Sequence, residues 1–140
     1  MTALFVKENG IMLKGQVQYV TLQLPDNGSL TIINVYAARS SNDIAPMWKK
    51  ISEAEFSSDH IILGGDFNHL EETNCRGMSG ERQMHRREAA SWHHMTLQYS
   101  LTDTWSLNSF RKMSKKEYTF DNGRSGAKSA ISRIDKFLVS

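Results

Sequence analysis

The sequence predicts an α/β domain, and three observations support this fold class. Residues 1–36 are rich in β-branched and aromatic side chains and contain turn dipeptides, a pattern typical of antiparallel strands. Residues 42–57 switch to helix formers, and the apolar run at residues 61–63 then has the character of a buried strand. Strand, helix and strand in this order form a βαβ unit, or a close relative of it within a mixed sheet.

Length and composition limit the class of protein. The 140 residues have the size of one domain, and with 39% hydrophobic and 23% charged residues we expect a single domain over residues 1–140. No apolar run is long enough to span a membrane and no signal peptide is recognisable, so we expect an intracellular protein without a membrane partner. A single cysteine excludes an internal disulfide, and a net charge of +2 is too small to indicate nucleic-acid binding by itself.

Turn signals divide the N-terminal region into strands. We expect Asn9-Gly10 to form the turn of an early hairpin, because this dipeptide favours the backbone conformation of a tight turn. The P-D-N-G sequence at residues 25–28 predicts a second turn, between a strand over residues 17–24 and one over residues 30–36. The region therefore predicts a small antiparallel sheet.

Polar side chains occur where two of the predicted strands end. Alternation in the strand after the second turn places Asn34 and Tyr36 on one face of the sheet. The apolar run ends in the sequence G-G-D-F-N, and in an extended chain Asp66 and Asn68 point to the same side while Phe67 returns to the core. We expect the polar groups to face a common space. The residues alone leave open an ordinary Asx-capped turn, and Tyr36 as a plain interface aromatic.

Two helices should cover the predicted sheet. The first has Asn42 or Asp43 available as its N-cap, and the second extends from about residue 83 to residue 99. The second helix contains His93-His94, but adjacent residues on a helix point about 100° apart and cannot bind one metal ion together. We therefore expect this histidine pair to lie at the surface.

The C-terminal region should add a further long strand. Residues 130–139 alternate cleanly, which predicts an extended segment with two distinct faces. Lys136 and Leu138 share one side of this strand, and Arg133 and Asp135 share the other. Arg133 and Asp135 can therefore pair on the face of the sheet.

Five motifs, taken in order, resemble those of the endonuclease/exonuclease/phosphatase superfamily. They are N-V-Y-A at residues 34–37, G-G-D-F-N at 64–68, L-T-D-T-W at 101–105, Y-T-F at 118–120 and S-R-I-D-K-F-L at 132–138. Within this superfamily the chain most resembles the apurinic-type endonuclease domains of LINE-type, non-LTR retrotransposons. Each motif alone is modestly specific, but five in order form a strong signal.

This resemblance implies a fold, a chemistry and a set of site residues. The fold would be a partial four-layered α/β sandwich of the DNase I-like type, and the activity would be Mg²⁺-dependent hydrolysis of phosphodiesters in DNA by in-line attack of water. The catalytic residues would be Tyr36, Asp66, Asn68 and Asp135. Contacts to the substrate would come from Asn34, Thr119, Ser132 and Arg133.

The resemblance also implies a role for each catalytic residue. Asp66 would position or deprotonate the attacking water, or protonate the leaving oxygen, and Asn68 would donate a hydrogen bond to the pentacovalent phosphorane. Tyr36 would contact the same phosphate. Asp135 would orient a catalytic histidine and fix its tautomer.

Two departures from the family pattern bear on activity. A metal-site asparagine and a metal-ligating glutamate would precede the region equivalent to Val17, and neither is identifiable there. The family's S-D-H triplet follows the S-R-I-D strand, whereas Ser58-Asp59-His60 precedes the G-G-D-F-N strand, where we expect a structural role. We therefore expect an internal fragment of an enzyme, truncated at both ends, with no identified metal ligand and with impaired or no activity.

Two other functions stay open at this point. One is a non-catalytic nucleic-acid-binding remnant that keeps the basic stretches at residues 76–87 and 111–133. The other is a phosphoesterase of the same superfamily that acts on another phosphate ester. For the main hypothesis the resemblance implies DNA as the partner, a nuclear location if the chain is active, and a parent polyprotein that can include a reverse transcriptase.

Overall fold

The elements of the chain follow the order expected for an α/β fold. The computed structural model describes residues 4–38, 40–68, 84, 86–107, 120–121, 131–132 and 135–140. Its elements are β1 (Phe5–Leu13), β2 (Val17–Gln23), β3 (Ser29–Tyr36), α1 (Ser41–Ser52), β4 (His60–Asp66), α2 (Arg86–Gln98), β5 (Thr102–Asp103), the 3-10 helix η1 (Thr104–Ser106), β6 (Phe120–Asp121), β7 (Ile131–Ser132) and β8 (Asp135–Val139). None of the helices in these ranges has the length and apolar character needed to cross a membrane.

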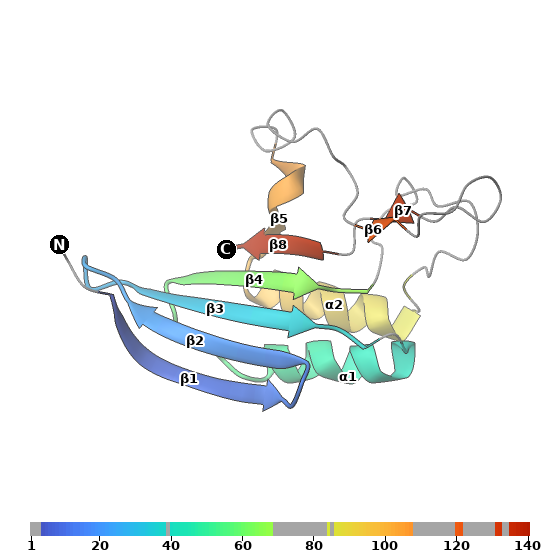
Figure 1. Ribbon diagram of the computed structural model, residues 1–140, viewed down its shortest axis with the longest axis horizontal. Coiled ribbons are helices and arrows are strands. Elements are labelled where there is room, and N and C mark those ends of the chain that lie inside the picture. The colour runs from blue at the N-terminus through green and yellow to red at the C-terminus, as the bar shows by residue number, and fades with distance from the viewer. Residues whose placement is uncertain are drawn as a thin grey trace.

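A mixed sheet of six strands, in the order β1-β2-β3-β4-β8-β5, organises the molecule (Figure 1). The strands β1, β2 and β3 are antiparallel neighbours, β3 and β4 are parallel, and β8 pairs antiparallel with both β4 and β5. The parallel pair with α1 between its strands is the predicted βαβ unit. A second, two-stranded sheet pairs β6 with β7.

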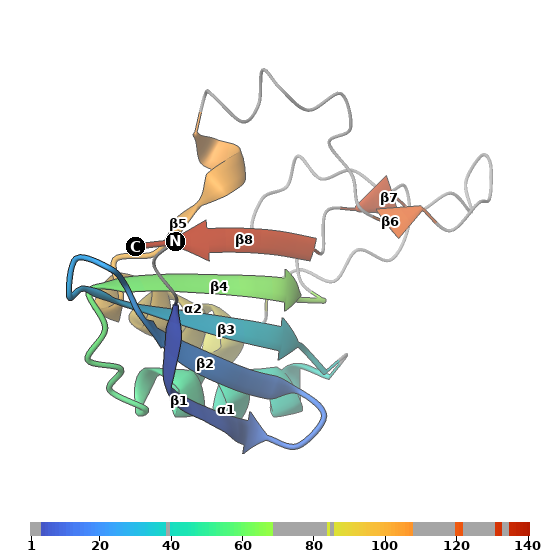
Figure 2. The same ribbon diagram turned by 60° about the vertical axis from the view of Figure 1, so that its left-hand side comes forward.

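The core lies between the six-stranded sheet and the two helices α1 and α2, which lie on the same side of it (Figure 1, Figure 2). Trp48 stacks on Phe67 with ring centroids 5.6 Å apart and meets the edge of Trp92 at 4.9 Å. At the end of α2 the Tyr99 hydroxyl donates to the carbonyl oxygen of Ile51 at 2.9 Å, which joins the two helices. The sheet contributes the buried side chains Val17, Ile33, Val35, Leu63 and Leu138.

Neither α1 nor α2 lies on the other face of the sheet, which we call the open face (Figure 2). Paired residues form four rows across it. The first contains Val6, Leu22, Leu30 and His60, and the second Asn9, Val20, Ile32, Ile62 and Val139. The third contains Ile11, Gln18, Asn34, Gly64 and Phe137, and the fourth Tyr36, Asp66 and Asp135.

The predicted early hairpin is wrong in its turn. β1 continues through Asn9-Gly10, and the chain reverses only around Gly15, where φ is +73°. Gly10 instead leaves room for the ring of Tyr19 on the paired strand, because a Cβ at residue 10 would lie 2.8 Å from that ring. Two shifts of register with β2 also accommodate the long strand. The second predicted turn, at residues 25–28, is confirmed by a hydrogen bond of 2.8 Å from the Leu24 amide to the Gly28 carbonyl.

Helix boundaries differ slightly from the prediction. α1 is capped by Ser40 and not by Asn42 or Asp43, because Ser40 has the extended backbone of an N-cap and accepts a hydrogen bond from the Asn42 amide at 3.3 Å. α2 begins at Arg86 and ends at Gln98. Its buried residues are Glu88, Trp92 and Met95.

The single strand predicted over residues 130–139 is wrong, because two strands in two sheets occupy this segment. β7 pairs with β6 in the small sheet, whereas β8 pairs with β4 in the large one. Within β8 the predicted alternation is confirmed, since Lys136 and Leu138 are buried while Asp135 and Phe137 are exposed. The proposed pairing of Asp135 with Arg133 falls on a residue outside the described ranges.

Truncating a core leucine should test this packing. Leu63 is fully buried in β4, so Leu63→Ala should lower the free energy of unfolding by about 2–5 kcal/mol through lost contacts and a cavity. Leu97, 78% exposed on α2, gives the matched control, and Leu97→Ala should change stability by less than about 0.5 kcal/mol. Urea unfolding followed by tryptophan fluorescence measures both, and equal losses would contradict the assigned packing.

Candidate active site

Cross-strand pairing brings three of the predicted site residues together. Tyr36 lies opposite Asp66 across the parallel pair β3 and β4, and Asp66 lies opposite Asp135 across the antiparallel pair β4 and β8. Directly paired residues point to the same face with Cβ atoms roughly 5 Å apart. Tyr36 is 57% exposed, so the row is accessible to a ligand. The pairing therefore brings together residues that are far apart in the sequence, and we call Tyr36, Asp66 and Asp135 the carboxylate row.

Asn68 joins this row through a turn and not through an extended strand. Its φ is +49°, its amide donates to Asp66 Oδ1 at 2.9 Å, and its Nδ2 donates to the Ala37 carbonyl at 2.6 Å. The predicted extended geometry from Asp66 to Asn68 is thus wrong, although Phe67 is fully buried as predicted. The turn holds the carboxamide beside the end of β3. An asparagine carboxamide carries two N–H donors, so the bond to Ala37 uses only one of them.

Two glycines before Asp66 allow this geometry, each for its own reason. A Cβ on Gly65 would lie 1.9 Å from the Val35 carbonyl oxygen, and its φ of +136° is one that L residues rarely adopt. A Cβ on Gly64 would lie 2.7 Å from the ring of Phe137, which covers it on the open face. Gly65 therefore allows β4 to approach β3 closely, and Gly64 leaves room for the ring of Phe137 on β8.

The predicted substrate-binding residues are only partly described. Asn34 is exposed on the open face, in the row next to the carboxylate row. Thr119 and Arg133 lie outside the described residues, and of Ser132 only the backbone in β7 is described. The structure therefore places one of the four, Asn34, near the catalytic candidates.

The described residues do not form a complete magnesium site. Nowhere in the described ranges do three or more His, Cys, Asp or Glu side chains gather in a way that could hold a metal ion. Mg²⁺ requires a nearly octahedral shell of oxygens, and the two carboxylates of the row supply only part of it. The Mg²⁺ that the resemblance implies therefore does not fit these residues alone. The histidines of α2 are exposed, as predicted.

The Ser58-Asp59-His60 segment has the structural role expected for it. Asp59 Oδ2 accepts hydrogen bonds from the Ser29 amide at 2.7 Å and from the Ser29 hydroxyl at 2.9 Å, which joins the starts of β3 and β4. The side-chain bond from Ser29, and then its backbone bond, lower the pKa of Asp59 below the ordinary value. His60 lies on the open face at the opposite end of β4 from Asp66.

Two ionisable side chains, Lys136 and Glu88, are buried, and the sequence pattern did not single them out. Lys136, which pairs with Gly65 beside the carboxylate row, is only 4% exposed, and its Nζ lies 6.0 Å from the ring centroid of Trp92. Glu88 is fully buried on α2. Helical spacing could have found Glu88, because it precedes Trp92 by four residues on the inward stripe of the helix.

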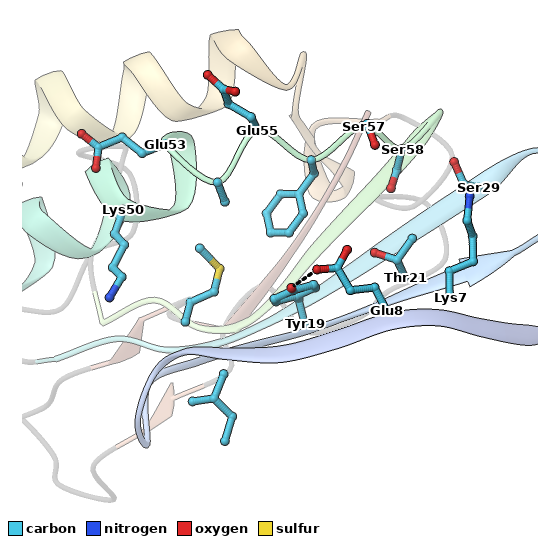
Figure 3. A pocket seen from close by; sticks show the side chains of 14 residues that line it. Lys7, Glu8, Tyr19, Thr21, Ser29, Lys50, Glu53, Glu55, Ser57 and Ser58 are labelled. Atoms are coloured by element: carbon cyan, nitrogen blue, oxygen red, sulfur yellow. Dashed lines mark hydrogen bonds between the residues drawn. The ribbon is translucent and has the colours of Figure 1, made fainter.

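A cavity of about 740 Å³ lies away from the row, between the β1–β2 hairpin and the connection from α1 to β4 (Figure 3). The Tyr19 hydroxyl donates to Glu8 Oε1 at 2.6 Å within its wall. Its lining carries charges of both signs, from Lys7, Lys50, Glu8, Glu53 and Glu55. This mixture selects no class of ligand, so the carboxylate row remains the candidate site.

Comparison with solved structures identifies the fold. An AP endonuclease from Archaeoglobus fulgidus matches with a TM-score of 0.64 and 11% identity, over 96% of this chain and 58% of that one. The 3′ phosphatase NExo from Neisseria, solved with a product DNA hairpin, matches with a TM-score of 0.63 and 18% identity, over 97% and 59%. An endonuclease/exonuclease/phosphatase family protein from Bacteroides thetaiotaomicron matches with a TM-score of 0.52 and 15% identity, over 98% and 51%.

These matches confirm the predicted fold class. The chain has the DNase I-like α/β fold of endonuclease/exonuclease/phosphatase proteins, and its layers are those of a partial sandwich. It spans between 51% and 59% of the length of these three structures. No protein-family profile matches the sequence, and no curated protein sequence matches it.

Substituting Gly65 tests whether the close approach of β4 to β3 supports the site. Gly65→Ala should destabilise the fold by more than Gly15→Ala, because Gly15 has a positive φ of +73° but open space around it. Gly15→Ala should therefore lower the free energy of unfolding only by the cost of a positive φ, about 1–2 kcal/mol. Urea unfolding of both variants measures the difference. Equal losses would show that contact with the Val35 carbonyl does not constrain Gly65.

The contact between Asp59 and Ser29 predicts a pH dependence of stability. Because the folded pKa of Asp59 is lowered, the ionised carboxylate stabilises the fold above its unfolded pKa of about 3.9. This stabilisation is lost as the pH falls through the lower, folded pKa. Unfolding free energies at pH 6 and pH 3 should therefore differ less in Asp59→Asn than in the wild type. Asp43→Asn, on α1, is the matched control, and an unchanged pH dependence in Asp59→Asn would refute the assignment.

Proposed function

We propose that the chain carries part of the active site of a phosphodiesterase that cleaves DNA, and that Tyr36, Asp66, Asn68 and Asp135 form its reacting edge. The observation that carries this proposal is their juxtaposition. Residues singled out by separate sequence motifs come from three different strands or strand ends and meet at one edge of the sheet. Polar residues at strand ends, placed by a rigid sheet, are where α/β folds bind and transform their ligands.

The roles follow from the chemistry of each group and its position. In-line hydrolysis of a phosphodiester requires an oriented water, a proton acceptor and a donor for the developing negative charge. The Asp66 carboxylate can accept the proton of the water or return a proton to the leaving oxygen. Asn68 has an N–H beyond the one held by Ala37 and can donate it to a phosphoryl oxygen. The exposed Tyr36 hydroxyl can donate to the same group.

Asp135 extends the edge toward β8 with a second carboxylate. Two carboxylates on directly paired positions repel one another, and they repel a phosphate as well. We propose that further oxygen ligands for a Mg²⁺ ion, and a histidine that Asp135 orients, complete the site from outside the described residues. The described residues would then bind and orient the phosphodiester and transfer protons. Mg²⁺ would supply charge compensation when it is bound.

We further propose that the nuclease is of the LINE retrotransposon type. The L-T-D-T-W and S-R-I-D motifs support this assignment, and in the first of them Asp103 accepts a hydrogen bond from the Trp105 amide at 2.9 Å and so caps η1. DNA as substrate is also supported by the fold shared with a 3′ phosphatase solved with a DNA hairpin. A nuclear site of action and a parent polyprotein with a reverse transcriptase belong to the same proposal.

Nicking of supercoiled plasmid tests the proposed activity. The 140-residue chain alone should not nick with Mg²⁺ or Mn²⁺, because its described residues lack a third metal ligand. A chimera that adds the flanking segments of an apurinic endonuclease of the same fold, with their metal-ligating glutamate and S-D-H triplet, should nick. In this chimera Asp66→Ala and Asn68→Ala should each lower the rate by about 10²–10³.

Two controls make the result specific. The added segments without the chain should be inactive. Asp43→Ala, on α1 and outside the carboxylate row, should leave the rate of the chimera unchanged. A folded chimera that binds DNA without nicking it would favour the nucleic-acid-binding remnant, and one that hydrolyses only other phosphate esters would favour the third hypothesis. Efficient nicking by the chain alone, lost in Asp66→Ala, would contradict the incomplete metal site.

A further inference from the structure

The exposed face of α2 carries basic side chains and no acidic one. Arg86, Arg87, His93 and His94 are exposed on this helix, and we call them the α2 basic face. Glu88 is the one acidic residue of α2, and it is fully buried. Within the described part of the chain, none of the four basic side chains forms an ion pair. A surface with charge of one sign suits a ligand of the opposite sign.

The neighbouring helix α1 has the mixed charges of an ordinary solvent-exposed helix. Its exposed residues include Asp43 and Glu53 as well as Lys49 and Lys50. Lys49 pairs with Glu53 at 3.6 Å across one helical turn. Pairs at this spacing stabilise a helix without any ligand. The sequence of α2 offers no exposed acid for such a pair, so stabilisation of the helix does not explain its basic residues.

The two arginines also occupy the end of α2 where cations are least favourable. They are the first two residues of the helix. The aligned peptide dipoles place partial positive charge at a helix N-terminus, so basic side chains there oppose the stability of the helix. Residues that break a local rule of stability are expected mainly where function requires them. At this end of α2 the arginines and the helix dipole together produce a positive potential.

The start of α2 lies at the end of the sheet that carries the carboxylate row. Directly after α2, the Tyr99 hydroxyl donates to the carbonyl oxygen of Ile51 near the end of α1, so the two helices end side by side. α1 begins where β3 ends, and α2 therefore begins at that same end of the molecule (Figure 1). In agreement, Trp92 in the middle of α2 meets the ring of Phe67, which follows β4, at 5.6 Å. A DNA duplex that reaches the row from this end of the molecule would pass the start of α2.

We propose that the α2 basic face binds the phosphate backbone of double-stranded DNA, as a second surface besides the carboxylate row. The choice of DNA rests on the proposed function, whereas the choice of the surface follows from the charges of α2. An arginine guanidinium group can bind a phosphate through two parallel hydrogen bonds. A histidine ring has at least one N–H donor in either protonation state.

The spacing of the basic side chains suits a row of phosphates. Residues seven apart lie on the same side of a helix, so Arg86 aligns with His93 at roughly 10.5 Å along the helix axis. Arg87 and His94 form a second pair with the same spacing. Phosphates of one strand advance about 3.4 Å per nucleotide along a duplex, so three steps cover nearly the same length. The small exposed side chain of Ala90, between the two pairs, leaves room for close approach of a DNA backbone.

An acidic protein partner fits this face less well. Interfaces between proteins are centred on large apolar or aromatic side chains that become fully buried. Among the described residues of α2, Leu97 is the one large apolar side chain that is exposed. It lies near the end of the helix, away from the arginines. A nucleic-acid backbone requires charges and hydrogen-bond donors and no such anchor.

Fluorescence anisotropy of a labelled DNA duplex, titrated with the chain in EDTA, measures this binding without cleavage. The double variant Arg86→Gln/Arg87→Gln should raise the dissociation constant about tenfold at moderate salt and lower the slope of log K against log salt by about two. Lys49→Gln/Lys50→Gln, on α1, is the matched control, because it removes the same charge, and it should change neither quantity. The arginine variant should melt no lower than the wild type, because it removes two cations from a helix N-terminus.

Kinetics of the nicking chimera separate this inference from the proposed function. There the arginine double variant should raise KM and leave kcat unchanged, because it removes binding that ground state and transition state share, whereas Asp66→Ala should lower kcat. DNA binding that depends on the arginines, in a chimera that never nicks, would contradict the proposed function alone. No binding of DNA by the chain, equal effects of the two double variants, or equally tight binding of polyglutamate would overturn the α2 basic face as a DNA-binding surface.

Discussion

The candidate site depends on how closely β4 approaches β3 at Gly65. The Val35 carbonyl oxygen occupies the space where any side chain would begin, so only glycine allows the two parallel strands to pair up to their ends. That pairing places Asp66 opposite Tyr36, and the next pair of strands places Asp135 opposite Asp66. The buried Phe67, which follows directly, anchors the same strand end in the aromatic core. Loss of this approach would therefore change the spacing of Tyr36, Asp66 and Asp135 together.

Local patterns in the sequence were sufficient wherever one face of an element is buried. Period-two alternation located Asn34 and Tyr36 on the exposed side of β3, and it separated Asp135 from Lys136 in β8 in the same way. The change from strand to helix and back predicted the βαβ unit, because each element must bury an apolar face against the next. The fold class could be predicted for this reason, and Phe67 could be assigned to the core from the same alternation.

Local patterns failed where a contact from elsewhere in the chain decides the conformation. Gly10 looked like a turn residue, but pairing with β2 and the ring of Tyr19 keep it within a strand. Asn68 leaves the extended conformation because its own amide bonds to Asp66 and its side chain to β3. The register that brings Asp135 to the site is set by pairing of distant strands, and only the resemblance between motifs, not any local pattern, pointed to it.

The division of the C-terminal segment between two sheets also limits how far these sheets can separate. Ser132, the last residue of β7, and Asp135, the first residue of β8, are joined by three peptide units, which reach roughly 11 Å at most. The small sheet therefore stays within this distance of Asp135, whatever conformation the intervening residues adopt. A ligand bound to the small sheet would therefore lie within a few side-chain lengths of Asp66 and Asp135. The length of the connection between β7 and β8 would set its local concentration there.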